Sequence, residues 1–234
     1  MTAIDERIAE GMREQLATRR ALLDEGERHL GWKVGFGSPA AARMLGIDRP
    51  LVGFLLERGL LPDGGEADVA AWKRPMLEPE IAVRMAADVP QGAPWDVVRG
   101  LIGGLAPAIE LADVDPPPSD VRAVLAGNIF HRHVVLGPFD ETRSTGEGIG
   151  ARVTIDGAEV AATGDASEIT GELVEVVRLT AELLDACGEQ LRAGDVVITG
   201  SAVAPVPIAP GQRVEAQLGP LGSLAVVLGG GATG

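Results

Sequence analysis

The chain has 234 residues, a net charge of −14 and a pI near 4.6. This length suits one domain, or one domain with a small appendage, and is long enough for an enzyme. The acidic balance argues against nucleic acid and anionic membrane surfaces as partners, because both require basic patches on the protein, and it favours a small-molecule ligand. The single cysteine, Cys187, excludes a disulfide framework and indicates a reducing compartment.

The first residues carry acids and lack the apolar core of a signal peptide. No stretch reaches the roughly 18 apolar residues that a membrane-spanning helix requires. We therefore expect a soluble, cytoplasmic protein.

Apolar residues recur at helical spacing over residues 4–25. They predict an amphipathic helix that packs on the main domain or on a partner subunit. Residues 31–39 indicate a short strand that runs into a turn. Ser38 then caps a helix whose first residue is Pro39.

Lys33 lies between apolar residues of this strand and is one of only two lysines among 20 basic residues. Such a lysine either extends its ammonium to solvent along an apolar surface or directs its charge into a pocket. Both alternatives are open at this point.

Glu78 and Glu80 stand two residues apart in an apolar run that follows a predicted strand or buried turn over residues 50–56. In a strand their side chains point to the same face, where two unpaired carboxylates repel each other. A divalent cation would remove this conflict. The alternative is an ordinary, half-solvated edge strand.

Glu110 stands in the middle of a second apolar strand, residues 107–113, after a predicted short helix over residues 95–105. Burying this carboxylate without a partner would be costly. As a third ligand beside Glu78 and Glu80 it would complete an all-oxygen site suited to Mg²⁺ or Mn²⁺. The alternative places Glu110 at a strand end, paired with an arginine.

A proline-rich spacer over residues 115–118 and a segment over residues 121–126 precede a predicted strand over residues 127–137. In that strand His131 and His133 would share a face. They would bind metal or move protons, or else form hydrogen bonds at the surface or an interface.

The remaining elements predict an α+β fold with a curled antiparallel or mixed sheet. They comprise a hairpin over residues 152–160, a long helix over residues 167–187, a strand over residues 195–201 and a hairpin formed by residues 213–218 and 223–228.

In this order the segments resemble the fumarylacetoacetate hydrolase superfamily, and within it the 2-oxo-4-pentenoate hydratases and 4-oxalocrotonate decarboxylases. The matching motifs are Gly31-Trp32-Lys33-Val34-Gly35, Leu77-Glu78-Pro79-Glu80, Pro107-Ala108-Ile109-Glu110, Gly188 to Asp195 and Ile198-Thr199-Gly200. The resemblance implies a rolled mixed β-sheet or barrel flanked by helices. It suggests an N-terminal helical segment with the first strands in residues 1–60 and a catalytic domain in residues 61–234.

The resemblance also implies roles for individual residues. Glu78, Glu80 and Glu110 match the three ligands of Mg²⁺, and Lys33 matches an active-site lysine whose pKa burial and the cation would lower. We expect the substrate-binding residues to be Asn128, Thr199, Gly200 and Ser201.

Two segments depart from the hydratase pattern. An acidic pair is replaced by Glu57-Arg58, so Glu57 is the candidate for the acid that handles protons. An Asp-Asn-x-Ser segment is replaced by Gly127-Asn128-Ile129-Phe130, followed by His131-Arg132-His133, which makes His131 a candidate base.

The resemblance implies metal-assisted enolisation of a 2-oxo acid. Hydration of a 2-oxo-enoate or 2-hydroxydienoate is the first choice and decarboxylation the second. A diverged isomerase or carbon–carbon hydrolase and a non-catalytic binding protein are further alternatives. The apolar content and the N-terminal helix favour a homo-oligomer.

Overall fold

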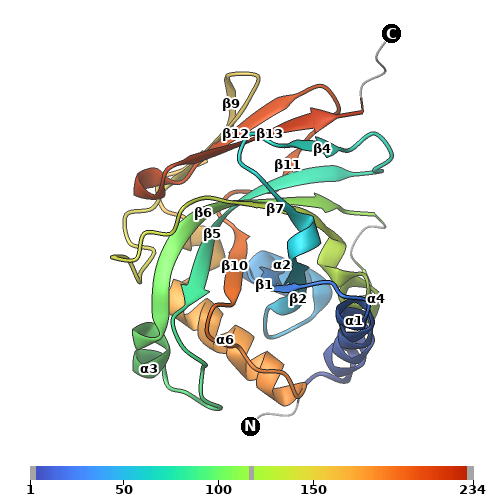
Figure 1. Cartoon of the computed structure of the whole chain (residues 1–234), viewed down its shortest axis with the longest axis vertical. Helices are drawn as coiled ribbons and strands as arrows, with labels where there is room; N and C mark the ends of the chain where they lie inside the picture. The colour runs from blue at the N-terminus through green and yellow to red at the C-terminus, as the bar shows by residue number, and fades with distance from the viewer. Residues whose placement is uncertain (1–3, 116–118, 231–234) are drawn as a thin grey trace.

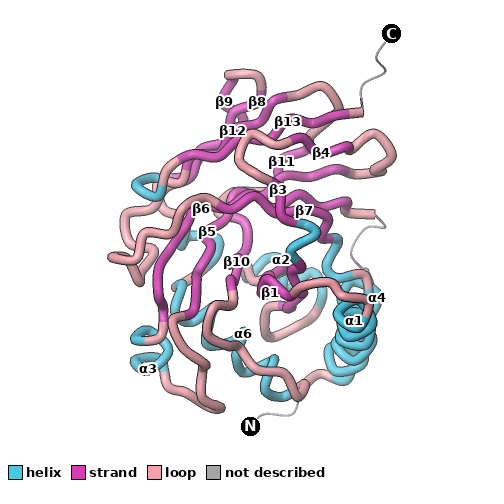
Figure 2. The backbone as a smooth tube through the Cα atoms, in the orientation of Figure 1, coloured by secondary structure: helices cyan, strands magenta, loops and turns pink. Residues whose placement is uncertain are grey.

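The computed structural model describes residues 4–115 and 119–230 and contains two β-sheets with helices at the periphery (Figures 1 and 2). The strands of the eight-stranded sheet are, in spatial order, β2 (Leu51–Leu56), β1 (His29–Gly35), β10 (Val196–Ser201), β5 (Pro75–Met85), β6 (Ile102–Asp113), β7 (His131–Leu136) and β3 (Leu60–Leu61), with β11 (Val206–Pro207) paired to β5. The strands of the five-stranded sheet are β4 (Glu66–Asp68), β13 (Ser223–Gly229), β12 (Arg213–Gln217), β8 (Ala151–Ile155) and β9 (Ala158–Thr163). The predicted α+β class is confirmed.

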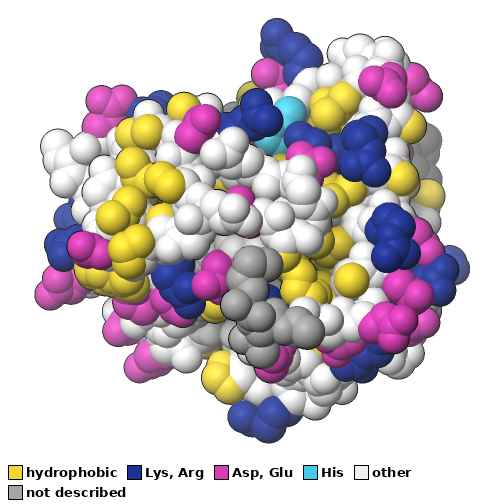
Figure 3. Space-filling model, turned by 90° about the horizontal axis from the view of Figure 1, so that it is seen from below, with side chains coloured by type: hydrophobic (Ala, Val, Ile, Leu, Met, Phe, Trp, Pro, Cys, Tyr) yellow, Lys and Arg dark blue, Asp and Glu magenta, His cyan; other side chains and the backbone are white. Residues whose placement is uncertain are grey.

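The helices are α1 (Glu6–Asp24), α2 (Pro39–Leu45), α3 (Trp95–Gly100), α4 (Val121–Ala126), α5 (Ser167–Thr170) and α6 (Leu173–Ala186), with short 3-10 turns at η1 (Glu57–Gly59), η2 (Asn128–Phe130) and η3 (Gly219–Leu221). Within the described ranges, no helix combines the length and the hydropathy needed to cross a bilayer. On the face shown in Figure 3, basic side chains are interspersed with acidic ones rather than gathered in one patch.

The larger sheet curls so that its two faces have different surroundings (Figure 1). Buried side chains of α1 and α6 pack with one face in the main apolar core. The other face carries a small apolar cluster made only of strand residues, with Ala82, Ala106 and Ala108 among them. We infer that this second face lies inside the curl, where small side chains leave room for the sheet to bend. By strand alternation Glu78, Glu80 and Glu110 belong to it.

The first strands are integral to this sheet. β1 lies between β2 and β10, pairing antiparallel with the former and parallel with the latter. α1 packs against α4 on the right in Figure 1. The division at residue 60 stays a prediction.

Two predicted helices are corrected by the structure. The helix predicted over residues 95–105 ends at Gly100, because residues from Ile102 onwards extend β6 along β5. The helix predicted over residues 167–187 is two helices, since Gly171 has a φ of +81° that interrupts the helical backbone. The side chain of Glu172 then caps α6 by accepting a hydrogen bond from the Glu175 amide.

The strand predicted over residues 127–137 begins only at His131. Asn128, Ile129 and Phe130 have φ values of 54°, 51° and 64°, so the backbone turns left-handed before β7 starts. The proline-rich spacer lies outside the described residues apart from Asp115. The N-terminal helix, the Ser38 cap and the two hairpins are confirmed.

Gly31 permits the close approach of β1 to β10. A Cβ atom added at Gly31 would lie 1.9 Å from the carbonyl oxygen of Val196, and a backbone atom in a paired strand cannot move aside. We expect Gly31→Ala to lower the free energy of unfolding by about 3 kcal/mol or more, measured by urea denaturation. Gly37→Ala is the control, because its nearest neighbour would lie 3.7 Å away, and equal stabilities of the two variants would contradict the expectation.

Candidate active site

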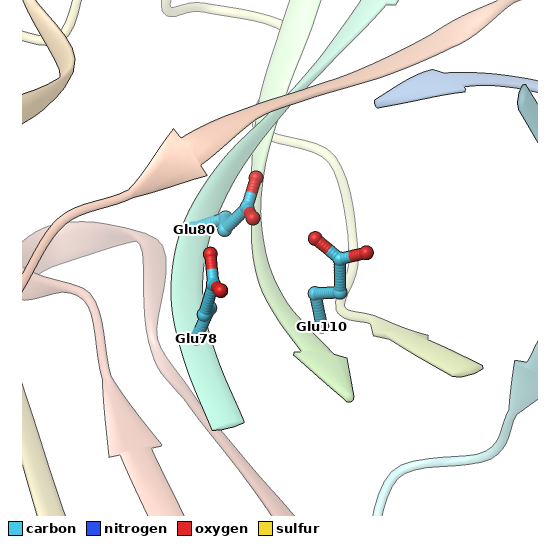
Figure 4. Close-up of side chains that lie close together, drawn as sticks. All are labelled: Glu78, Glu80 and Glu110. Carbon is cyan, nitrogen blue, oxygen red and sulfur yellow. The ribbon is translucent and has the colours of Figure 1, made fainter. Parts of the chain in front are cut away.

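Three glutamate side chains converge on the inner face of the curled sheet (Figure 4). Glu78 and Glu80 project from the same side of β5, and Glu110 lies directly opposite Glu78 on β6. One carboxylate oxygen of each lies within 4.8 Å of the other two. Because β5 is flanked by β10 and β6, the edge-strand alternative is excluded. The predicted convergence of the three carboxylates is present.

Lys33 is buried and directed at this cluster. Its Nζ lies 2.7 Å from Oε2 of Glu110 and donates a hydrogen bond to the carbonyl oxygen of Ile129 at 3.3 Å. Only 2% of the residue is exposed, which excludes extension to solvent. The neighbouring position on β2 is Gly53, where an added Cβ would lie 2.9 Å from Cγ of Lys33. The glycine therefore makes room for the lysine stem.

The pKa of Lys33 reflects its acidic neighbours. Burial by itself would lower the pKa of this ammonium, but the charge of Glu110, supported by Glu78 and Glu80, outweighs burial and raises it. The expected lowering included the charge of a bound cation and stays a prediction. The three carboxylates by themselves favour the protonated form of Lys33.

His131 contacts the other carboxylate oxygen of Glu110. Its Nδ1 lies 2.8 Å from Oε1 of Glu110, and its Nε2 is buried without a hydrogen-bond partner among the described residues. Burial would raise the pKa of Glu110, but Lys33 and His131 together hold it at about 2. An ionised carboxylate only accepts hydrogen bonds, so in a neutral imidazole Nδ1 carries the proton and Nε2 is a free acceptor.

The other histidine has a different environment. His133 stacks on the indole of Trp72 with ring centroids 6.0 Å apart. His133 lies opposite Leu111 and His131 lies opposite Ala112, with a register shift between these two pairs. The two histidines therefore do not share a face of β7, contrary to the prediction from the sequence.

The electrostatics of the cluster fit a divalent cation. Burial and the charge of Glu110 raise the pKa of Glu78 to about 7, and the same causes together with Glu78 raise the pKa of Glu80 well above its usual range. Oε1 of Glu80 is buried with no hydrogen-bond partner among the described residues. A dication at this point would compensate the repulsion and satisfy that oxygen. Glu78, Glu80 and Glu110 therefore form a set of oxygen donors that could hold a hard metal ion.

The residues after Ile198 position Glu80. The amide of Gly200 donates a hydrogen bond of 2.7 Å to Oε2 of Glu80, and the Thr199 hydroxyl donates one of 3.0 Å to the carbonyl oxygen of Ile81. Ser201 lies opposite Glu80 in the strand register, and its buried hydroxyl has no partner among the described residues.

Asn128 holds the turn that precedes His131. Its Oδ1 accepts a hydrogen bond from the Phe54 amide at 2.8 Å, and its Nδ2 donates one to the Phe54 carbonyl oxygen at 3.0 Å. These two hydrogen bonds to β2 hold the left-handed backbone of the turn, and this backbone directs the Ile129 carbonyl at Lys33. Sequence reasoning missed the Ile129 carbonyl, since a main-chain contact of this kind leaves no side-chain signature.

Glu57 is not among the residues brought together. It begins the turn η1, where its half-exposed carboxylate forms an ion pair with Arg28. The structure thus joins Lys33, Glu78, Glu80, Glu110 and His131, supported by Asn128, Thr199, Gly200 and Ser201, and leaves Glu57 outside.

Known proteins are similar to this chain in sequence and in fold. A 4-oxalocrotonate decarboxylase from a Pseudomonas species is 28% identical over 91% of this chain and 85% of its own length. A 2-keto-4-pentenoate hydratase from Burkholderia vietnamiensis is 30% identical over 85% of this chain and 78% of its own length. The structure of 4-oxalocrotonate decarboxylase from Pseudomonas putida G7, complexed with magnesium and adipate, superposes with a TM-score of 0.88 at 27% identity, covering 94% of this chain and 86% of that one.

A family profile described as the fumarylacetoacetate (FAA) hydrolase C-terminal domain matches residues 38–228. That range includes all three glutamates of the cluster and both histidines of β7. Together with the relatives in the hydratase and decarboxylase branch, it confirms the resemblance seen in the sequence. The chain belongs to the fumarylacetoacetate hydrolase family.

Proposed function

We propose that this chain is a metal-dependent hydro-lyase that adds water to a 2-hydroxydienoate or 2-oxo-enoate, with Mg²⁺ or Mn²⁺ held by Glu78, Glu80 and Glu110. The observation that carries the proposal is the convergence of three carboxylates within 4.8 Å in a buried site that also holds an ammonium and an imidazole. Oxygen-only donor sets suit hard divalent cations. The Pseudomonas putida relative with the same fold was crystallised with magnesium.

A bound cation would supply the positive charge that stabilises the enolate of a 2-oxo acid. The residues around it would divide the remaining tasks. Lys33 keeps a positive charge beside Glu110 and favours binding of an anionic substrate. His131, oriented through Nδ1 by Glu110, offers Nε2 as the acceptor for a proton from water or substrate.

Of the expected substrate-binding residues, Ser201 is the strongest candidate for direct contact, because its hydroxyl is unused. Asn128, Thr199 and Gly200 already form hydrogen bonds to Phe54, Ile81 and Glu80. We assign these three as positioning residues.

Decarboxylation of a 4-oxalocrotonate-type substrate is the second candidate. It is favoured by the decarboxylases among the relatives, one of which covers 91% of this chain at 28% identity. Both reactions proceed through the same enolate, so the metal cluster does not distinguish them. The unpartnered Nε2 of His131 favours hydration as the first choice, because adding water requires a proton acceptor.

The test follows ultraviolet absorbance of 2-hydroxypenta-2,4-dienoate and carbon dioxide release from 2-oxohex-3-enedioate, each after EDTA treatment and after restoring Mg²⁺. We expect Mg²⁺-dependent loss of dienoate absorbance without release of carbon dioxide. Metal-dependent carbon dioxide release would select decarboxylation instead. No metal-dependent turnover of either compound would contradict both assignments.

The thermal stabilisation by Mg²⁺ is expected to depend on pH. In the folded protein without metal, the pKa of Glu78 is raised to about 7. The contribution of Glu78 to stability is therefore fully present below the pKa that Glu78 has in the unfolded chain, and it is lost as pH rises through 7. A cation requires the ionised carboxylates, so the gain in Tm on adding Mg²⁺ should be small at pH 5.5 and reach a plateau above pH 8.

Differential scanning fluorimetry with and without Mg²⁺ measures this gain in Tm across the same range of pH. The lowered pKa of Glu110 does not obscure it, because that contribution is lost only as pH falls towards 2. A gain in Tm that is independent of pH would contradict the expectation.

A further inference from the structure

One polar side chain of α1 is completely buried. Gln15 is 0% exposed and shares the buried face of the helix with Ile8, Met12 and Leu16, which belong to the main apolar core. Burying an amide group costs free energy unless hydrogen bonds compensate for the lost water. The role of Gln15 therefore depends on the groups to which it bonds.

Gln15 bonds to two segments that are far from it in the sequence. Its Nε2 donates a hydrogen bond of 3.2 Å to the carbonyl oxygen of Val52 in β2 and one of 2.9 Å to the carbonyl oxygen of Leu125 near the end of α4. Its Oε1 is buried with no hydrogen-bond partner among the described residues. Because an unpaired buried acceptor offsets much of the stability that the two bonds provide, their main effect is on geometry.

Gln15 and Asn128 hold one short segment along the outer edge of β2. This strand is the last in the larger sheet and pairs only with β1 on its other side. Val52 and Phe54 are two residues apart, so they direct main-chain groups to the same edge. Asn128 bonds to both the amide and the carbonyl oxygen of Phe54, and Gln15 bonds to Val52 and Leu125. Residues 125–128 are therefore fastened to β2 at both ends.

The fastened segment leads directly to two contacts of the glutamate cluster. The carbonyl oxygen of Ile129 accepts a hydrogen bond from Nζ of Lys33 at 3.3 Å, and Nδ1 of His131 lies 2.8 Å from Glu110. The side chain of Ile129 fills the space over Gly35, where an added Cβ would lie 2.8 Å from its Cγ2. A displacement of the segment along β2 would therefore move the carbonyl and the imidazole together.

α1 approaches α4 closely beside Gln15. Gly11 lies one helical turn before Gln15, and a Cβ added at Gly11 would lie 2.7 Å from Cβ of Leu125 and 3.0 Å from the carbonyl oxygen of Arg122. The two helices lie side by side in Figure 1. A larger side chain at Gly11 would push the helices apart and lengthen the hydrogen bond from Gln15 to Leu125.

We infer that Gln15 is a positioning residue of the active site, which acts through the Asn128 turn to direct the Ile129 carbonyl and the His131 imidazole at the cluster. Helix α1 is then part of the catalytic structure rather than only a cover for the sheet. The link from α1 to the turn stands on hydrogen bonds within the chain, and its effect on turnover rests on the proposed function.

The first measurement is amide hydrogen exchange in the metal-free protein, which requires no substrate. The Phe54 amide donates to Asn128, and we expect it to exchange at least about tenfold faster in Gln15→Met, because methionine keeps the length of the side chain but donates no hydrogen bond. Gly11→Ala should accelerate the same amide with Gln15 still in place. Unchanged exchange in Gln15→Met would overturn the link, and if that variant does not fold, Gly11→Ala decides in the same way.

The second measurement separates positioning from general stability. Leu16→Ala is the matched control, because Leu16 is 2% exposed on the same helix and its truncation lowers Tm without removing a hydrogen bond. At saturating Mg²⁺, well below the Tm of each variant, we expect kcat to be about tenfold lower in Gln15→Met and within about twofold of wild type in Leu16→Ala. The Mg²⁺ affinity of both variants should stay within about threefold, since the three glutamates belong to β5 and β6.

The two failures are distinguishable. Equal losses of kcat in Gln15→Met and Leu16→Ala would overturn the positioning role, as would faster exchange of the Phe54 amide with an unchanged kcat. A wild-type protein that turns over neither substrate, combined with faster exchange in Gln15→Met, would overturn the proposed function and support the link from α1 to the turn.

Discussion

Glu110→Gln is expected to lower the affinity for Mg²⁺ at least about 100-fold, to abolish activity and to destabilise the metal-free protein by about 3 kcal/mol. Glutamine keeps the size of the side chain but removes the charge that Lys33 and His131 both contact. The ammonium of Lys33 would then remain buried without its closest counter-ion, and removing one partner of a buried pair costs more than the pair contributes.

The matched control is Glu78→Gln. Its carboxylate has a pKa raised to about 7 by burial and by the charge of Glu110, so above pH 7 it repels its neighbours in the metal-free protein. Substitution should lower Mg²⁺ affinity as well, but it should leave the metal-free protein equally stable or more stable. Titration calorimetry and urea denaturation at pH 8 measure the two effects separately.

Unchanged Mg²⁺ affinity in Glu110→Gln would remove Glu110 from the metal site. Equal destabilisation by Glu78→Gln and Glu110→Gln would contradict the assignment of Glu110 as the counter-ion of Lys33. The two readouts therefore test separate parts of the cluster.

Strand alternation explains why the acidic pair could be predicted. Residues two apart in a strand share a face whatever the strand pairs with, so Glu78 and Glu80 required no tertiary information. Glu110 required more, because its place opposite Glu78 depends on the register of two strands joined by a helix. The family resemblance supplied that register.

The environment of His131 could not be predicted from the local sequence. Nothing in the sequence Asn128-Ile129-Phe130 demands three consecutive left-handed residues, which cost about 1–2 kcal/mol each when they carry a Cβ. The hydrogen bonds between Asn128 and Phe54, 74 residues apart, help to offset that cost. A strand was the better prediction from local propensity, and tertiary contacts overrode it.

The position of β1 within the sheet decides between the two alternatives for Lys33. Its apolar neighbours fit both a surface strand and a buried one, and only the pairing of β1 with β2 and β10 on both sides decides between them. Gly53 was the available signal, since a glycine inside an apolar strand often marks the close approach of another group. The group in this case is the lysine stem.

The second large effect is expected from His131→Ala, which should lower kcat about 100-fold while changing Mg²⁺ affinity less than about threefold. The variant removes the free acceptor Nε2 but leaves Glu110 paired with Lys33, so the ligand set keeps its charge. Steady-state kinetics at saturating Mg²⁺ separate kcat from KM, and metal titration gives the affinity.

His133→Ala is the control, because this ring stacks on Trp72 and has no contact with the glutamates among the described residues. It should retain most of the activity. Added imidazole should restore part of the turnover in His131→Ala, since the cavity left by the side chain can hold the free base beside Glu110. A merely structural histidine would show no such rescue, and full activity in His131→Ala would exclude His131 as the proton acceptor.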